Sequence, residues 1–150
     1  MIDRSRIGFS TAPTAVVFDA WRVKLFCQAI GETDAVHRDE AAARAAGHRG
    51  CPVPPTYLKA IDGEHFSSAA LMQMLQVPLR RVLHAEQAFE HHAAVHVGDE
   101  VEVSRTVVDI HDKKDGAMSF IVVDTRYRVG ATSVASSRQT ILVRNALAAE

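Results

Sequence analysis

Long apolar runs are missing from this 150-residue sequence, and so is an excess of charge of either sign. The most apolar stretches, "TAVVF" and "VPPTYL", are far shorter than the ~20 residues that a membrane-spanning helix needs. The 17 Lys and Arg residues are scattered and nearly balance the 18 Asp and Glu residues, so they form no basic stripe. These absences argue against membrane and nucleic-acid partners.

Cysteine is scarce as well. Cys27 and Cys51 form no paired motif, which suits a reducing compartment and excludes a disulfide framework or a cysteine-rich metal site. The N-terminal "MIDRSRIGFS" lacks the apolar core of a signal peptide, so we expect a soluble cytoplasmic protein. Residues 1–150 fit one domain that can bury a core without disulfides or metals.

The first half of the sequence predicts one short strand followed by helices. Residues 15–19, "AVVFD", form a short segment rich in β-branched side chains, which favours a strand. Residues 20–31 place Trp21, Leu25 and Ala29 on one helical face before a glycine ends the pattern.

Two further helices are expected before the sequence pattern changes. Asp39 is a suitable N-cap for the alanine-rich "EAAARAAG", a helix of about two turns that Gly47 should end. Pro54 and Pro55 suit the first turn of a helix, where an N–H would be unpaired in any case, and Gly63 or the "SSAA" after it can interrupt that helix. The next segment, "ALMQMLQ", is either another helical piece or a mobile flap.

From Leu79 onward the pattern favours strands rich in Val, Ile and Thr, at residues 80–95, 99–111, 117–129 and 132–145. The connections "HVGD", "DKKDG" and "GA" carry turn residues, so consecutive strands should pair as an antiparallel meander. This order predicts an α+β domain in which a long helix is wrapped by a curved antiparallel sheet of about five strands. An exposed sheet edge favours dimerisation.

The stretch "GETDAVH" places Glu32, Asp34 and His37 in one turn. A carboxylate and an imidazole at this spacing can hold a water molecule and transfer protons to and from a substrate. Alternatively, Asp34 caps the turn, Glu32 is solvated and His37 is a surface histidine. Composition alone favours this second interpretation.

The segment "GCPVPPTY" has few backbone donors, because its three prolines lack an N–H group. The remaining donors, at Gly50, Cys51, Val53, Thr56 and Tyr57, lie near a helix N-terminus and could stabilise the oxyanion of a thioester. Alternatively, the prolines stiffen a connection and begin a buried helix. Cys51 has no evident activating base, so we expect a small buried residue and not a nucleophile.

"IGETDAVHRDEAAARAAG" followed by "HRGCPVPPTYL" resembles the MaoC-like acyl dehydratases and hydratases, and most of all the subgroup related to the fatty-acid-synthase dehydratase domain. "LHAEQAFEHHAAVHVGDEVEV" is similar to a strand–turn–strand segment of that group, and the resemblance extends over residues 7–145. It implies a hot-dog fold, dimers, and a tunnel for an acyl thioester of coenzyme A or acyl carrier protein.

The hydratase motif of that family reads Gly-Asp, any residue, Asn-Pro, an aliphatic residue and His. Gly31 and His37 match it. Glu32 stands in the position of the catalytic Asp, Asp34 in that of the Asn, and Ala35 replaces the proline. Because Glu is one methylene longer than Asp, either Glu32 or Asp34 can be the working carboxylate.

The resemblance implies reversible hydration of a 2-enoyl thioester to a 3-hydroxyacyl thioester, without a metal or organic cofactor. Some members of the subgroup lack the acid/base pair and shape the acyl channel of a second hot-dog subunit, which is the alternative function. The third choice, a thioesterase, usually needs a carboxylate on the central helix, where this sequence offers Asp62 and Glu64.

Other histidines invite less specific interpretations. His91, His92 and His96 lack a further ligand at a convincing spacing, so solvated histidines around a hairpin are expected and not a metal site. His84 and Glu86 lie two apart on one predicted strand, so they should share a face and either line the channel or pack.

Overall fold

The computed structural model describes residues 2–145, so residues 1 and 146–150 of the expected domain lie outside the described part. The helices are α1 (Ala20–Ile30), α2 (Glu40–Ala45), α3 (Tyr57–His65) and α4 (Ser68–Met74), with 3-10 turns η1 (Arg4–Arg6), η2 (Ala35–His37) and η3 (Leu79–Arg81). The strands are β1 (Thr14–Val17), β2 (Val82–His91), β3 (Glu100–Lys113), β4 (Met118–Val129) and β5 (Thr132–Arg144).

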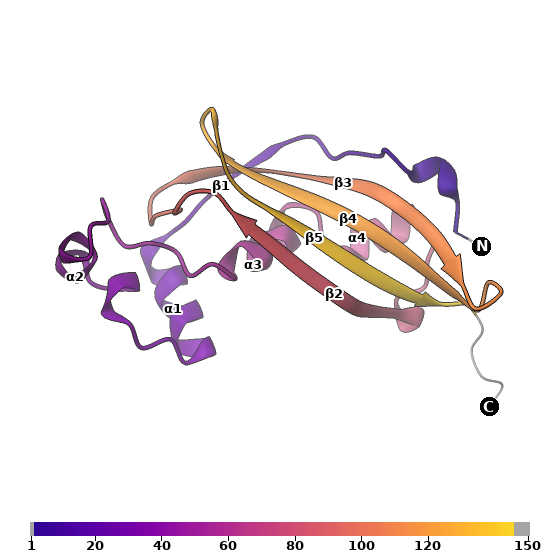
Figure 1. The fold of residues 1–150 in the computed structure, drawn as a ribbon, viewed down its shortest axis with the longest axis horizontal. Coiled ribbons are helices and arrows are strands. Elements are labelled where there is room, and N and C mark those ends of the chain that lie inside the picture. Colours follow the sequence, from indigo (N-terminus) through magenta and orange to yellow (C-terminus); the bar gives the residue numbers. More distant parts are fainter. Residues whose placement is uncertain (1, 146–150) are drawn as a thin grey trace.

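The five strands form one antiparallel sheet in the order β1-β3-β4-β5-β2. The sheet is curved, α3 and α4 lie along one of its faces, and α1 and α2 gather beyond one end (Figure 1). The expected α+β architecture, with helix packed on a curved sheet of five strands, is confirmed. No helix within residues 2–145 is both long and apolar enough to cross a membrane.

The expected meander is correct only for its last three strands. β2 pairs with β5 at the far edge of the sheet and not with β3, so the predicted hairpin at "HVGD" is wrong. Residues 92–99 instead cross the end of the sheet. Their backbone is hydrogen-bonded to residues 51–53. The Val53 amide donates to the Val95 carbonyl (2.8 Å), and the Val97 amide donates to the Cys51 carbonyl (2.9 Å). The crossing therefore fixes the proline-rich segment against the end of the sheet.

The central helix is divided into two shorter helices. Gly63 lies inside α3, and the break occurs at Phe66, which is extended (φ −143°). Ser67 then caps α4 by accepting the Ala70 amide at 3.1 Å. The segment "ALMQMLQ", which the sequence allowed to be either a helix or a flap, therefore belongs mostly to a helix. Pro54 and Pro55 do not open α3 but precede it, because the helix begins at Tyr57 after Thr56. The Pro54 carbonyl accepts the Tyr57 amide (2.9 Å).

Local signals set the boundaries of α1 and α2 as expected. Gly31 ends α1 in the left-handed conformation (φ 72°), and Asp39 caps α2 through the Ala42 amide at 2.8 Å. The apolar stripe of α1 does not enter the core: Trp21 and Leu25 are exposed. Val23 and Cys27 are the buried residues of this helix.

The core consists of two apolar clusters with polar residues between them. Along the three central strands, Arg105, Thr125 and Gln139 stand between members of the two clusters. Asp62 of α3 reaches this layer, accepts a hydrogen bond from Tyr127 (2.6 Å) and is 2% exposed. The buried carboxylate of the central helix is therefore committed to the core.

Candidate functional site

The turn after α1 holds the residues of the "GETDAVH" motif. Asp34 caps η2 by accepting the Val36 amide at 3.0 Å, as the capping interpretation expected. Glu32 is half-buried, and its Oε1 accepts the Asp34 amide at 2.8 Å. Both carboxylates therefore bind backbone amides of their own turn.

The imidazole of His37 is fixed by the proline-rich segment. Its Nδ1 lies 2.7 Å from the carbonyl oxygen of Pro52. A carbonyl can only accept, so Nδ1 carries the hydrogen, and in the neutral ring Nε2 is left with a lone pair. Nε2 makes no hydrogen bond within residues 2–145. The fold thus orients one basic nitrogen away from its anchor.

His37 lines a cavity of about 440 Å³, here called the His37 pocket. Most of its wall is apolar and comes from the proline-rich segment, α3 and the crossing segment, including Val53, Pro55, Leu58 and Val95. Four histidines, His37, His48, His91 and His92, also line it. Neither Glu32 nor Asp34 is among the lining residues.

The four predicted substrate-binding positions are not gathered at one place. Gly50 and Cys51 line a different hollow of about 320 Å³, whose wall also includes His37. Val53 lines the His37 pocket, but its amide donates to Val95, so this amide is not available as an oxyanion donor. Thr56 is the N-cap residue of α3.

Free donors nevertheless exist at the start of α3. The amides of Thr56 and Leu58 donate to no acceptor within residues 2–145, and Leu58 lines the pocket. A helix N-terminus carries a partial positive charge that favours a developing oxyanion. The sequence analysis did not include the Leu58 amide among the candidate donors. Its position three residues after Pro55, in the first turn of the expected helix, could have indicated it.

A polar cluster of the buried residues Asp99 and His96 and the exposed Arg49 lies next to the pocket wall. The Asp99 carboxylate accepts two hydrogen bonds from Arg49 (2.5 Å each) and one from the His96 amide (2.9 Å). His96 is 7% exposed, and neither nitrogen of its ring has a hydrogen-bond partner among residues 2–145. The expectation that His96 is solvated is wrong, because the crossing segment carries its side chain inward. His91 and His92 are exposed, as expected.

Burial and charge set the protonation of this cluster. Burial acts to raise the pKa of Asp99, but the hydrogen bonds from Arg49 and the His96 amide outweigh it and hold that pKa below its ordinary range. Burial lowers the pKa of His96, and Arg49 lowers it further. The imidazole of His96 is therefore neutral at pH 7.

We expect the free energy of unfolding to fall as the pH drops below 6.5, the ordinary value for histidine. The pKa values of His96 and, through burial and Arg105, of His65 are both lowered in the folded chain, so only the unfolded chain takes up these protons just below pH 6.5. Urea unfolding at pH 7.5 and pH 5.5 measures this difference. His96→Leu should reduce it, and equal free energies at the two pH values would contradict the expectation.

The structure also shows where the remaining histidines and Cys51 lie. A β-bulge between His84 and Glu86 shifts the register of β2, so these two side chains lie on opposite faces and not on one. His84 faces inward and contacts Gln139 at 3.2 Å. Within residues 2–145 no group of three or more His, Cys, Asp or Glu side chains is arranged to hold a metal ion. Cys51 is buried as expected, and burial raises the pKa of its thiol.

The comparison with protein families identifies this architecture. Residues 5–135 match the family described as the FAS1-like, dehydratase domain region. The chain belongs to this family. A UPF0336 protein of Saccharopolyspora erythraea is 31% identical over 147 residues, which cover 95% of this chain and 92% of that relative.

Solved structures of dehydratases and hydratases share the fold of this FAS1-like dehydratase-region chain. The HadBC (3R-hydroxyacyl-ACP dehydratase) complex of Mycobacterium tuberculosis superposes with a TM-score of 0.80 at 14% identity, covering 91% of this chain and 96% of that one. The (R)-hydratase of A. caviae involved in PHA biosynthesis gives 0.70 at 20% identity, covering 90% and 94%. These similarities confirm the hot-dog fold.

Proposed function

We propose that this chain catalyses reversible addition of water to a 2-enoyl thioester, giving a 3-hydroxyacyl thioester, in the His37 pocket. The observation that carries the proposal is the ring of His37. Its Nδ1 is bound to Pro52, and its free Nε2 belongs to a residue in the wall of a mostly apolar cavity. An imidazole fixed in this way beside apolar surface suits proton transfer to a bound acyl group. Membership of a dehydratase family supports the same reaction.

The fixed tautomer assigns His37 its role in the proposed reaction. Its Nε2 takes a proton from water while the water oxygen bonds to C3 of the enoyl group. The displaced electron pair moves to the thioester oxygen, and a second group then delivers a proton to C2. The amides of Thr56 and Leu58 are the donors proposed for the thioester oxygen. Dehydration follows the same steps in reverse.

The proposed mechanism also needs a second group, which delivers the proton to C2. Glu32 and Asp34 are the carboxylates that the family motif suggests for it. Each binds a backbone amide of the turn, and neither lines the pocket. The substrate class is an acyl thioester of coenzyme A or acyl carrier protein, whose shared phosphopantetheine arm would reach the pocket from solvent.

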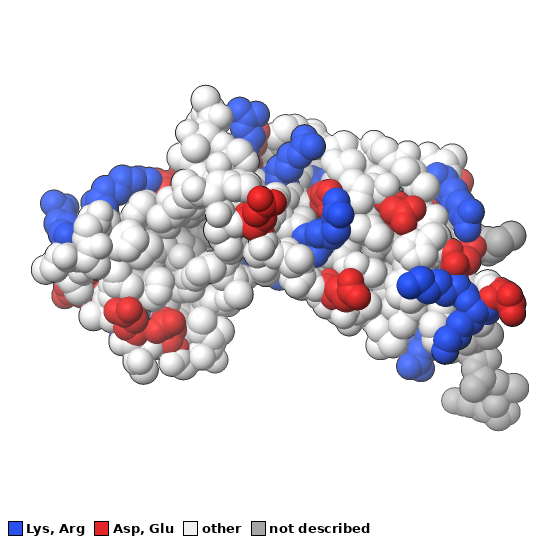
Figure 2. Space-filling view, viewed as in Figure 1, with Lys and Arg blue, Asp and Glu red and all other residues white. Residues whose placement is uncertain are grey.

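Assembly with a second hot-dog subunit, of the same or another chain, belongs to the proposal. β2 is an edge strand of the sheet, and its last residue, His91, lines the pocket. A partner strand added along β2 would satisfy its free backbone groups and approach the pocket. Figure 2 shows Lys and Arg side chains interspersed with Asp and Glu over one face, with no large area of a single charge.

The test uses the purified chain with 2-enoyl-CoA substrates of short and long acyl chains. Loss of the ultraviolet absorbance of the conjugated thioester measures hydration. We expect a rate proportional to protein concentration for at least one chain length. A folded protein that hydrates none of these substrates, alone or with a hot-dog partner, would overturn the proposal.

A second function, a binding subunit that shapes the acyl channel of a catalytic hot-dog partner, has one specific observation in its favour. No carboxylate lines the His37 pocket within residues 2–145. A subunit of this kind would be inactive alone and would raise the activity of the co-expressed partner even as His37→Ala. A thioesterase is disfavoured, because Asp62 is bound to Tyr127 and Glu64 pairs with Arg22.

A further inference from the structure

Every titratable side chain that lines the His37 pocket is an imidazole. His37 and His48 come from the two ends of one short segment, and His91 and His92 come from the end of β2. Water addition needs one group that removes a proton and another that supplies one. Within the described residues, the chain therefore offers histidines for both tasks at this cavity.

The turn that ends α2 gives His48 a defined position. Gly47 is left-handed (φ 89°) and its amide donates to Arg44 (3.0 Å), while the amide of His48 donates to Ala43 (2.9 Å). These two bonds form the Schellman motif, in which the left-handed residue is usually glycine. The backbone of His48 is consequently anchored to α2, at the wall of the pocket.

The ring of His48 is also held from behind. It packs edge-on against the buried ring of His96, with ring centroids 5.7 Å apart. His48 is half-buried, whereas His91 and His92 are exposed. The charged groups beside His96 are Asp99 and Arg49, and the Asp99 carboxylate is already paired with Arg49.

We propose that His48 is the second proton-transfer group of this site, an inference that rests on the proposed hydratase function. In the hydration direction, His37 Nε2 removes a proton from water as the C3–O bond forms. The protonated imidazole of His48 then gives its proton to C2 as the enolate electron pair returns to carbon. His37 ends protonated and His48 neutral, and proton exchange with solvent restores both.

Two histidines can divide these roles because an imidazole can act as a base in its neutral form and as an acid in its protonated form. Hydration then needs one imidazole neutral and the other protonated, so its kcat/KM should fall on both sides of an optimum pH.

The experiment compares His48→Gln with Glu32→Gln in the hydration assay. Glutamine at 48 preserves a polar side chain but cannot transfer the proton, so kcat should fall by about a hundredfold with little change in KM. It should also remove the alkaline limb of the pH profile. Glutamine at 32 can still accept the Asp34 amide, so a large loss of activity in that variant would identify Glu32, and not His48, as the proton-transfer group. His111→Gln, on the outer face of the sheet, is the matched control.

A second variant separates chemistry from packing. In His48→Ala, added imidazole should restore part of the lost rate if the side chain transfers a proton, and should restore nothing if it only supports the wall. Full activity in His48→Gln, or a collapse in Glu32→Gln, would overturn the role of His48 and leave the hydratase proposal standing. A wild-type protein without hydratase activity would overturn both.

Discussion

Replacing His37 with alanine is expected to lower kcat/KM for hydration of a 2-enoyl-CoA by about a thousandfold. The substitution removes the nitrogen proposed to take the proton from water, and no other side chain is anchored to the Pro52 carbonyl in its place. Steady-state hydration rates over a range of substrate concentrations measure the effect. Most of the loss should lie in kcat, because the apolar wall that would hold the acyl chain remains.

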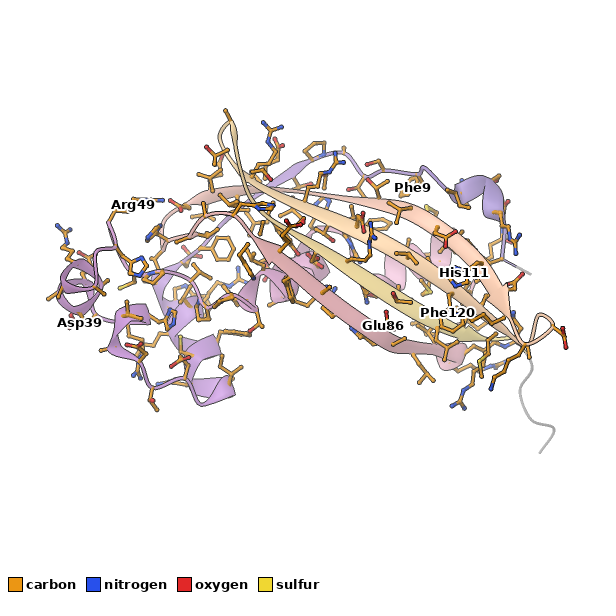
Figure 3. The ribbon with its side chains drawn as sticks, viewed as in Figure 1. Phe9, Asp39, Arg49, Glu86, His111 and Phe120 are labelled. Carbon is orange, nitrogen blue, oxygen red and sulfur yellow. The ribbon has the colours of Figure 1, made fainter. Side chains whose placement is uncertain are left out.

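His37→Asn separates proton transfer from anchoring. The asparagine amide can still donate to the Pro52 carbonyl, but it cannot act as a base, so its loss should match that of His37→Ala. His111→Ala is the control: His111 lies beside Phe120 at the end of the sheet far from Arg49 (Figure 3) and should retain wild-type rates. Activity within tenfold of wild type in both His37 variants would contradict the assigned role. Tenfold corresponds to a difference of about 1.4 kcal/mol in the activation free energy.

Local sequence signals predicted much of the fold. Gly31 and Asp39 were placed correctly at a helix end and a helix start, because capping depends on a few adjacent residues. The pairing of β2 with β5 was not predicted, because the turn-like "HVGD" is compatible both with a hairpin and with a crossing segment. The hydrogen bonds that decide between them come from residues 51–53, about 45 positions earlier in the chain.

The candidate site was predicted less completely, for a physical reason of the same kind. The spacing of the motif singled out His37, which the structure places in the wall of the pocket. Capping by Asp34 was the interpretation that composition favoured, but the hydrogen bond from the Asp34 amide to Glu32 was not predicted, because a Glu side chain can be solvated, face a cavity or accept a nearby amide. His48 was missed, although Gly47 before it was recognised as the end of a helix. Only the fold shows that this turn carries His48 to the pocket.

The largest effect on stability is expected from Asp62→Ala, at about 3–5 kcal/mol. Asp62 is 2% exposed and accepts hydrogen bonds from Tyr127 and Lys59 (2.9 Å). Burial lowers the pKa of Arg105, and the charge of Asp62 opposes that effect. Alanine would leave the Tyr127 hydroxyl without this acceptor and two partly or fully buried cations without their counter-charge.

Urea unfolding and thermal melting measure this loss, which should lower Tm by roughly 10 °C for a domain of this size. The matched control is Asp124→Ala. Asp124 accepts two hydrogen bonds of 2.7 Å from Arg138 on the outer face of the sheet, where water solvates both partners. Its loss should cost about 1 kcal/mol or less. Equal effects of the two substitutions would contradict the view that burial decides the cost.

Tyr127→Phe provides the intermediate case. It removes one hydrogen bond to Asp62 but keeps the carboxylate near Lys59 and Arg105, so about 1–2 kcal/mol is expected. If Tyr127→Phe instead matched Asp62→Ala, the hydroxyl and not the charge would hold the polar layer together. The expected order, Asp62→Ala well above Tyr127→Phe, follows because an unpaired buried cation costs more than an unpaired buried acceptor. The carboxylate of the central helix thus serves the core, and the proposed chemistry is left to the histidines at the end of the sheet.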